Sequence, residues 1–527
     1  MIASRLPGLR AAAAGALAIA VGLAAACGPA RPAETMTVLA GSEIKDLEPW
    51  LEDIRRATGV RLELQYSGTL AGIERIFGGE AFDAVWFSHA KYLALSDTGH
   101  TRIKAQERIM LSPVVLGVRS SKARAFGWVG NPNVTWVDVA AKVRSGDLHY
   151  AMTNPTASNS GFSAVIGVAA ALSGSTDALR AGEVDTRALR DFFQGQQLTA
   201  GSSGWLAEAY VRDQDRLDGI INYESILLSL NRSGQLREPL VLVYPREGIV
   251  TADYPLVLLN AAKRDAYNRL VAYLRGADFQ RTIMTRTWRR PVNPDVALDP
   301  AFPRNLIVEL PFPTDLGVVD RILDSYLSDQ RRPAHAFFLL DVSGSMSGDR
   351  LADLESALGA LAGDDPSLTG RFAKFQPREL VTMATFSDDI EEQREFDLGS
   401  AARAPAVRGE IRAFAQTLRA GGGTALFSSL QALYREALQA RSRDPQRYYS
   451  IVLMTDGESN RGISVDEFRT FYQSLPADQQ DLKVFAIRFG EANSRQLQEV
   501  TELTGGRLFQ GSAGQLATVF KEIRGYQ

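Results

Sequence analysis

The sequence DVSGSM, residues 341–346, directly follows the apolar run FFLL at residues 337–340. The run predicts a short buried strand, which ends at once in an acid and two serines at alternate positions. Asp341, Ser343 and Ser345 therefore offer hard oxygen atoms on one tight loop, a donor set that suits Mg2+ or Mn2+ and suits zinc or copper poorly. Gly344 lets the backbone fold around an ion. The stretch predicts a metal site at the end of a buried strand.

Two later stretches have the same character. GGGT, residues 421–424, adds the hydroxyl of Thr424 after a flexible loop, and TDG, residues 455–457, adds Asp456 after the predicted strand SIVLM. A lone D-x-S-x-S motif would be weak evidence, because short Ser/Gly turns after strands commonly do no more than cap the next helix. All three parts in this order favour one shared metal site over separate helix caps.

This order resembles the metal-ion-dependent adhesion site of von Willebrand factor A (VWA) domains. The resemblance covers residues 334–527 and implies a doubly wound, Rossmann-like sheet with the site at the carboxyl ends of its strands. It implies Mg2+ or Mn2+ as the cofactor and the following residues around the ion: Asp341, Ser343, Ser345, Thr424 and Asp456. An ion held this way keeps an open coordination position, which implies a protein partner that offers an acidic side chain.

The composition places limits on the architecture and the partners. A chain of 527 residues is too long for one hydrophobic core, so two or three domains are expected. Charged residues at 23% and hydrophobic residues at 45% are ordinary for a soluble globular protein. A net charge of −3 gives no general attraction to nucleic acid, and we expect no nucleic-acid partner.

The single cysteine, Cys27, excludes an internal disulfide and a multi-cysteine zinc site. It follows Arg5, Arg10 and an apolar run at residues 11–26, which is short for a membrane-spanning helix and fits the hydrophobic part of a signal peptide. The stretch resembles a bacterial lipoprotein signal, which implies that Cys27 is lipid-modified and anchors the mature chain to a membrane. Leu23 lies one residue further from the cysteine than usual, so plain secretion with cleavage nearby is the alternative. Either way we expect the mature protein outside the cytoplasm.

Strands alternate with helices from residue 36 to about residue 290, which predicts a mostly parallel sheet with a ligand crevice beyond its strand ends. The layout resembles type II periplasmic solute-binding proteins, two-lobed clamps that include molybdate and sulfate binders. The resemblance places ligand contacts at Ser42, Ser67, Gly68, Thr69, Ser158, Asn159, Ser160 and Tyr223. These groups are neutral donors and helix N-termini, so the expected ligand is a small polar solute or an oxyanion. In the loop at residues 153–161, each polar residue could instead be an N-cap alone.

Six prolines between residues 291 and 313 exclude a helix or a central strand there. This segment either wraps back on the first domain or spaces two modules. QRRP, residues 330–333, predicts the hinge. The predicted division is a signal at 1–27, a tether at 28–35, a solute-binding-like domain at 36–333 and a VWA domain at 334–527.

Enzyme signatures do not occur in the sequence. His89, His100, His149 and His335 lack metal-ligand spacing, and there is no G-x-S-x-G, Walker A or HExxH motif. We therefore expect an α/β binding protein without enzymatic activity, anchored to a membrane, that engages a protein partner through its metal site. The alternative is the solute receptor of an ABC-type importer, with the VWA domain as a docking accessory.

Overall fold

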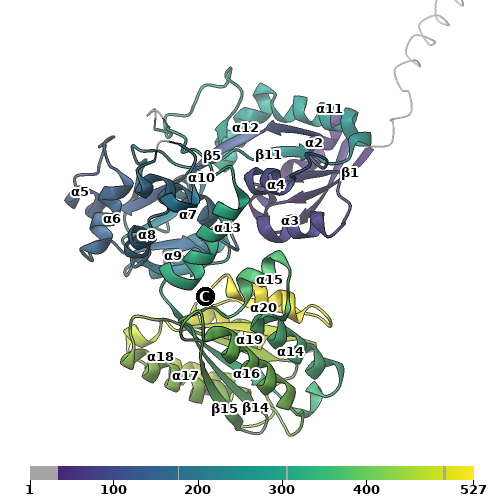
Figure 1. Ribbon diagram of the computed structural model, residues 1–527, viewed down its shortest axis with the longest axis vertical. Helices are drawn as coiled ribbons and strands as arrows, with labels where there is room; N and C mark the ends of the chain where they lie inside the picture. Colours follow the sequence, from purple (N-terminus) through teal and green to yellow (C-terminus); the bar gives the residue numbers. More distant parts are fainter. Residues whose placement is uncertain (1–33, 176, 304–306, 491–493) are drawn as a thin grey trace, which may run out of the picture.

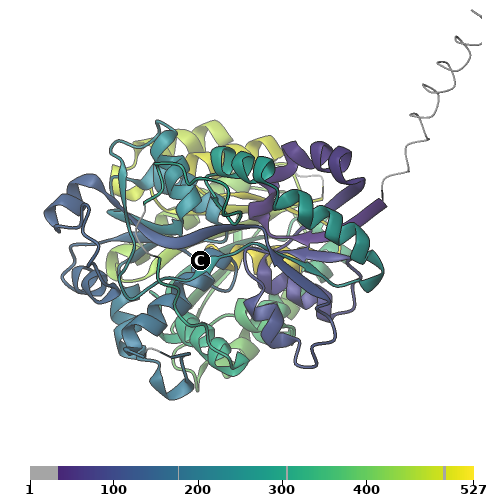
Figure 2. The same ribbon diagram turned by 90° about the horizontal axis from the view of Figure 1, so that it is seen from above.

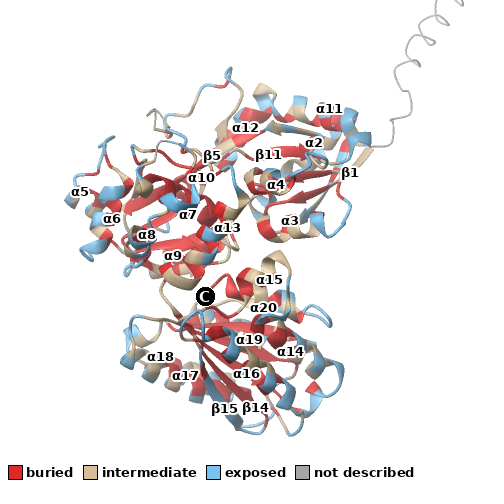
Figure 3. Ribbon diagram, in the orientation of Figure 1, coloured by how far each residue is buried: buried red, intermediate tan, exposed pale blue. Residues whose placement is uncertain are grey.

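The computed structural model describes residues 34–175, 177–303, 307–490 and 494–527. These residues form two lobes and a C-terminal domain, each built on its own sheet with helices packed against it (Figure 1). Seen from above, the two lobes overlie the C-terminal domain (Figure 2). The central strands are buried, and the exposed residues lie on the outer helices and loops (Figure 3).

The first lobe has a five-stranded sheet in the order β2-β1-β3-β11-β4, in which β1 runs parallel to β2 and β3 and β11 runs antiparallel to β3 and β4. Its strands are β1 (Glu34–Ala40), β2 (Val60–Tyr66), β3 (Ala84–Trp86), β4 (Ala105–Arg108) and β11 (Pro255–Leu258). Its helices are η2 (Ser42–Trp50), α2 (Leu51–Thr58), α3 (Thr69–Phe77), α4 (Lys91–Ser96), η4 (Ala261–Lys263), α11 (Arg264–Leu274) and α12 (Ala277–Thr287).

The second lobe has a seven-stranded sheet in the order β10-β5-β8-β6-β7, with β9 and β12 also paired to β5. Its strands are β5 (Met110–Arg119), β6 (Tyr150–Thr153), β7 (Gln196–Ala200), β8 (Gly219–Tyr223), β9 (Leu240–Val243), β10 (Thr251–Ala252) and β12 (Arg290–Pro291). Its helices are α5 (Ser120–Ala125), α6 (Trp136–Arg144), α7 (Asn159–Ser173), η3 (Ala181–Glu183), α8 (Thr186–Phe193), α9 (Ser203–Asp213) and α10 (Glu224–Arg232).

The C-terminal domain has a six-stranded sheet in the order β15-β14-β13-β16-β17-β18, parallel except for the edge strand β15. Its strands are β13 (Ala334–Asp341), β14 (Leu380–Phe386), β15 (Ile390–Asp397), β16 (Tyr448–Thr455), β17 (Lys483–Phe489) and β18 (Leu508–Gly511). Its helices are η6 (Gly344–Met346), α14 (Asp349–Gly359), η7 (Ala360–Asp364), α15 (Leu368–Ala373), α16 (Ala404–Thr417), α17 (Leu426–Arg443), α18 (Val465–Ser474), η8 (Ala477–Gln479), α19 (Ser494–Thr504) and α20 (Leu516–Arg524).

Strand β13 shows why this sheet is covered on both faces. Every residue of β13 is buried, and successive side chains of a strand point to opposite faces. Phe338 and Leu340 enter a core cluster that holds residues of α14, α16 and α20, whereas Phe337 and Leu339 enter a second cluster with residues of α17, α18 and α19. A continuous apolar run in a parallel sheet is typical of this arrangement. The doubly wound α/β fold predicted from the sequence is confirmed.

Several helices begin where their capping residues predict. Thr135 accepts a hydrogen bond from the Asp138 amide, and Asp138 accepts one from the Thr135 amide, so α6 begins with a capping box. Ser464 and Glu467 form the same pair at the start of α18. In both helices the capping residue directly precedes the first helical residue.

The proline-rich segment wraps back on the second lobe. Ile249 forms an isolated bridge with Glu309, and the Leu310 amide donates to the Ile249 carbonyl at 2.9 Å. Leu310 and Phe302 are buried. The chain then continues through α13 (Leu316–Ser325) and the π-helical turn η5 (Tyr326–Gln330) into β13. Tyr326 donates to the side chain of Gln196 at 2.9 Å, which joins this connecting helix to the second lobe.

The predicted signal and Cys27 lie outside the described residues. Within residues 34–527, leaving aside the short gaps, no helix is both long and apolar enough to span a membrane.

Candidate functional site

The end of β13 holds Asp341 in a fixed orientation. The Asp341 carboxylate is fully buried; its Oδ1 accepts from the Ser343 amide at 2.8 Å and its Oδ2 from the Thr455 hydroxyl at 2.5 Å. Thr455 ends β16, the neighbour of β13 in the sheet. Burial raises the pKa of the Asp341 carboxyl above its ordinary value, although the hydrogen bonds from Ser343 and Thr455 oppose that shift. A cation beside this carboxylate would relieve the cost of its burial.

The two serines and the second acid of the motif lie directly beside one another. Ser343 Oγ is 3.2 Å from Ser345 Oγ, and Ser345 Oγ donates to Asp456 Oδ1 at 2.7 Å. The Asp456 side chain is fully buried. Residues from the ends of β13 and β16 therefore share one cluster, as expected for strand ends that meet at the same edge of a parallel sheet.

Thr424 reaches the same place from the loop before α17. The Gly344 amide donates to the Gly422 carbonyl at 3.1 Å, so this loop lies over the DVSGSM turn. Gly422 has a φ of 76°, and a side chain there would meet Ser387 Oγ at 2.7 Å, so glycine is required. A Cβ on Gly457 would lie 3.6 Å from Ser345 Oγ and 3.7 Å from Thr424 Oγ1. Both hydroxyls thus face one point in front of Gly457.

Arg350 is a member of this cluster that the motif did not indicate. Its guanidinium donates to Asp456 Oδ2, and its Nη1 also lies 3.3 Å from the Ser345 carbonyl. The side chain starts on α14, one turn after the DVSGSM loop, and is 37% exposed. Gly490 leaves space for the guanidinium, because a Cβ there would lie only 3.3 Å from it. Nothing in a D-x-S-x-S pattern signals such an ion pair.

The cluster has the chemistry of a hard-cation site. Its donors are two carboxylates and three hydroxyls, all oxygen, which Mg2+ and Mn2+ prefer. In the described part of the chain, no group of three or more His, Cys, Asp and Glu side chains is placed to hold a metal ion. A site of this kind would therefore depend on the hydroxyls of Ser343, Ser345 and Thr424 as well as on the acids.

The crevice between the two lobes is crossed by direct hydrogen bonds. Tyr223, at the end of β8, places its hydroxyl 3.1 Å from both Glu43 Oε1 and Ser88 Oγ of the first lobe. Asn159, at the start of α7, donates to Ser88 Oγ at 2.5 Å and lies 3.4 Å from the Tyr223 hydroxyl. The Asn159 Oδ1 atom is buried without a hydrogen-bond partner. Tyr223 and Asn159, both predicted from the sequence, thus meet the first lobe.

A buried group of hydroxyls lies behind Asn159. Ser160 Oγ is 2.8 Å from Ser203 Oγ and 2.9 Å from Thr153 Oγ1, and Ser158 Oγ is 3.3 Å from both Ser160 Oγ and Ser203 Oγ. These groups join the start of α7 to the end of β6 and the start of α9. Ser158 and Ser160 therefore support the loop at the crevice in a common network.

The predicted residues of the first lobe differ in their surroundings. Ser42 and Gly68 are exposed, and Ser67 and Thr69 are half-buried. Gly68 lies beside the second lobe, since a Cβ there would be 3.0 Å from the Ala157 carbonyl. Ser42 itself is exposed, while its neighbour Glu43 provides the contact with Tyr223.

Charged residues also line this crevice, although the sequence pointed only to neutral donors. Burial raises the pKa of the Glu43 carboxyl, against the hydrogen bond from Tyr223 and the charge of Arg289. Arg289 is 2% exposed, pairs with Asp46 at 2.6 Å and donates to the Glu43 carbonyl at 2.8 Å. Its guanidinium lies 4.8 Å from the ring centre of Tyr254. Arg289 is far from every short motif in the sequence, so only the tertiary fold reveals it.

Two family models match the chain. Residues 36–287 match the model described as bacterial extracellular solute-binding protein, and residues 337–522 match that of the von Willebrand factor type A domain. No curated protein matches the chain.

Solved structures of periplasmic binding proteins resemble the chain at low identity. One is the periplasmic binding protein AfuA from Actinobacillus pleuropneumoniae, with fructose-6-phosphate bound: 14% identity over 56% of this chain and 98% of that chain, with a TM-score of 0.43. The sulfate-binding protein SubI from Mycobacterium tuberculosis H37Rv gives 19% identity over 55% and 98%, with a TM-score of 0.39. The apo ferric ion-binding protein A from Pasteurella haemolytica gives 13% over 56% and 97%, with a TM-score of 0.44. The two family matches show that the chain combines a bacterial solute-binding domain with a VWA domain that follows it.

Proposed function

We propose that the protein is an extracytoplasmic binding protein whose VWA domain engages an acidic side chain of a protein partner through a bound Mg2+ or Mn2+ ion. The observation that carries this proposal is one hydrogen-bonded cluster of Asp341, Ser343, Ser345 and Asp456, in which the Ser345 hydroxyl lies beside that of Thr424 near Gly457. Two carboxylates just neutralise a divalent cation, so an incoming carboxylate from a partner can complete the coordination shell.

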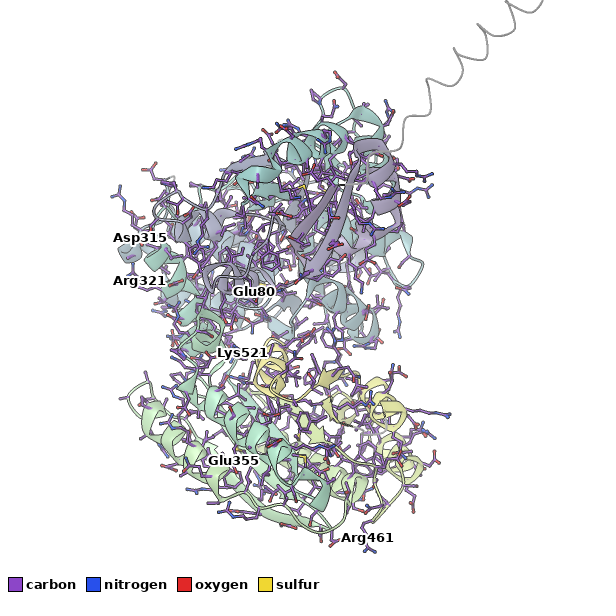
Figure 4. All side chains as sticks on the ribbon, turned by 90° about the vertical axis from the view of Figure 1, so that its right-hand side faces the viewer. Glu80, Asp315, Arg321, Glu355, Arg461 and Lys521 are labelled. Carbon is purple, nitrogen blue, oxygen red and sulfur yellow. The ribbon has the colours of Figure 1, made fainter. Side chains whose placement is uncertain are left out.

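The position of the cluster suits a docking site. Arg461 pairs with Asp388 at 3.3 Å, and its amide lies 3.3 Å from the Thr424 carbonyl, so it marks the rim of the cluster. Figure 4 places Arg461 at the end of the VWA domain furthest from the solute-binding lobes, whereas Lys521 lies at the end that faces them. A partner would therefore reach the metal without meeting the lobes.

The test is metal titration of the full chain by calorimetry, followed by partner capture from membrane extracts with Mg2+ or with EDTA. Asp341→Asn should abolish the heat of Mn2+ binding and the EDTA-sensitive capture while the circular dichroism spectrum is unchanged. Asp466→Asn is the matched control, because Asp466 forms an exposed ion pair with Arg469 on α18 of the same domain. Mn2+ binding that survives in Asp341→Asn would overturn the proposed site.

A second function, solute reception for an importer, is favoured by the hydrogen bonds across the crevice. Glu43, Arg289, Asn159 and Tyr223 would offer a small polar solute both charged and neutral partners. A thermal-shift panel of oxyanions, sugar phosphates, sugars and amino acids tests this role. A compound that stabilises the wild type and the Tyr66→Phe control, but not Tyr223→Phe, would support it. A panel in which nothing stabilises the wild type would count against a working clamp.

Membrane attachment through Cys27 belongs to the same proposal. The bacterial solute-binding domain supports a location outside the cytoplasm, and the sequence before Cys27 supports processing as a lipoprotein. Cys27→Ser should move the protein from the membrane fraction to the soluble fraction. Unchanged fractionation and unchanged mass would contradict the anchor.

A further inference from the structure

The VWA domain contacts both lobes of the solute-binding clamp. Figure 1 shows α3 of the first lobe and α9 of the second lobe facing the VWA domain. On the side of the first lobe, α15 packs against α3, and the Thr369 amide donates to Glu74 Oε2 at 2.7 Å. Lys521 of α20 holds Thr369 in turn, at 3.0 Å from its hydroxyl.

The connecting helix α13 adds a second link on the same side. Asp320 accepts from the Tyr92 hydroxyl of the first lobe at 2.8 Å, and its other oxygen lies 3.0 Å from Arg371 Nη2 of the VWA domain. We call the two contacts with the first lobe, Thr369–Glu74 and Tyr92–Asp320, the clasp. The clasp rests on two part-buried hydrogen bonds, and Arg371 lies beside the Asp320 carboxylate from the VWA side.

The contact with the second lobe includes buried aromatic packing. The Tyr526 ring packs edge-on against Trp205 with 5.0 Å between ring centres, and both residues belong to the core cluster that continues into the VWA domain. Lys483 pairs with Asp213 at 2.9 Å and Arg212 donates to the Gly505 carbonyl at 3.2 Å. The buried aromatic packing should stabilise more than the two part-buried hydrogen bonds of the clasp, so the VWA domain should stay with the second lobe when the clasp breaks.

The two lobes are joined by a hinge, and opening of the crevice requires motion at this hinge. The chain passes between the lobes at residue 109, at residues 253–254 and at residues 288–289. Tyr254 and Trp288, at two of these crossings, have positive φ angles of 38° and 54°. Such strained residues are typical of positions that absorb a change of backbone angle. The VWA domain is attached to both lobes at a distance from this hinge. The crevice between the lobes therefore cannot widen while both attachments hold.

The loop at the crevice lies between the first lobe and the VWA domain. The Ala157 carbonyl is 3.0 Å from the Cβ position of Gly68 in the first lobe, and the Ala157 Cβ is 2.7 Å from that of Gly525 in the VWA domain. Asn154, which shapes the same loop, lies 3.4 Å from the Arg524 carbonyl. Ala157 therefore lies against both the first lobe and the end of α20.

We propose that the VWA domain restrains the solute-binding clamp, so that the crevice opens only when α15 releases α3. Opening then breaks the clasp while the VWA domain moves as one body with the second lobe. A solute that closes the crevice stabilises the clasp, and loss of the clasp favours the open form, because the two equilibria are linked.

The test is a distance measurement between the lobes by double electron–electron resonance. Spin labels go on the exposed residues Glu63 and Arg187 of full-length protein in which Cys27 is replaced by serine. Glu74→Lys removes the acceptor of Thr369; Glu80→Lys is the control, because Glu80 pairs with Arg75 within the first lobe. Tyr92→Phe breaks the second link independently, because it removes the hydroxyl that Asp320 accepts from.

We expect one short distance in the wild type and the control, and an added longer distance in Glu74→Lys and Tyr92→Phe. The ratio of open to closed forms should rise by about tenfold, as expected for the loss of one hydrogen bond to a charged group. Identical distance distributions in all four proteins, with unchanged melting temperatures, would show that the clasp does not restrain the clamp. This outcome is independent of metal binding and of any solute.

Discussion

Arg524 Nη2 lies 2.7 and 2.6 Å from the two carboxylate oxygens of Glu379, at the junction between the VWA domain and the clamp. Arg331, in the predicted hinge, pairs with the same carboxylate, and its Nη1 donates to the Gln527 carbonyl. All three charged side chains are at most 7% exposed. One buried acid therefore holds the hinge segment and the end of α20 together.

Glu379→Gln should destabilise the protein by about 3 to 5 kcal/mol, because it leaves two buried guanidinium groups without a counter-charge. Burial already lowers the pKa of Arg331, which reflects the cost of its charge there. The measurement is the free energy of unfolding in urea. Glu410→Gln is the control, since Glu410 and Arg394 form an exposed pair, and its loss should cost about 1 kcal/mol or less.

The C-terminal fold was predictable from the sequence because the strands of this domain are continuous apolar runs. The candidate site residues lie at the ends of these runs. β17 ends where its apolar run ends, Asp341 is the last residue of β13, and Asp456 directly follows β16. The crevice was less predictable. Its contacts depend on which residue of a turn points inward, and at the end of β1 it is Glu43 rather than the exposed Ser42 that meets Tyr223.

The contact between the domains could not be read from the sequence at all. Glu379, Arg331 and Arg524 are distant in the chain and belong to no motif, and their pairing follows from the packing of α20 against the sheet. The same holds for Arg350, which is an ordinary residue of an amphipathic helix until the fold brings Asp456 beside it.

Gly457→Ala should weaken metal binding without unfolding the domain. A Cβ at this position makes ordinary contacts of 3.6 and 3.7 Å with the hydroxyl oxygens of Ser345 and Thr424, so the fold tolerates it. The methyl group would occupy space that the ion and its water ligands need. Calorimetry with Mn2+ should show a loss of affinity of about tenfold or more, corresponding to roughly 1.4 kcal/mol. Gly421→Ala is the control, since no atom lies within 4 Å of its Cβ position; equal affinity in both variants would contradict this geometry.

Arg350→Gln should strengthen metal binding. The guanidinium holds Asp456 by an ion pair and places a positive charge beside the cluster, which opposes a divalent cation. Glutamine removes that charge and keeps a hydrogen-bond donor. Calorimetric affinity for Mn2+ should rise by about tenfold at low salt and by less at high salt, because salt screens the half-exposed charge. Arg350→Lys should behave like the wild type. Weaker binding in Arg350→Gln would mean that Arg350 positions Asp456 for the ion instead.

The last prediction concerns His89, which lies fully buried beside Ser88 at the crevice, with neither ring nitrogen hydrogen-bonded. Its ring packs against Phe162 and Phe312, and burial, aided by the charge of Lys91, lowers its pKa to about 3. His89 therefore takes up a proton near pH 6.5 in the unfolded chain but stays neutral at that pH in the folded protein. Stability from this residue is complete above about pH 6.5 and falls as the pH drops towards 3, by at most about 1.4 kcal/mol per pH unit.

His89→Leu should reduce this loss of stability, measured as the midpoint of urea unfolding between pH 7.5 and 4.5. The variant should stay within about 1.5 kcal/mol of the wild type at pH 7.5, because leucine is apolar and of similar size. Some slope should remain, since burial and the charge of Arg447 also lower the pKa of His335, to about 4. His100→Asn serves as the control, because His100 is exposed and asparagine tolerates its positive φ of 51°. A His89→Leu profile parallel to that of the control would mean that His89 accepts a proton in the folded protein, and that its pocket is open to water.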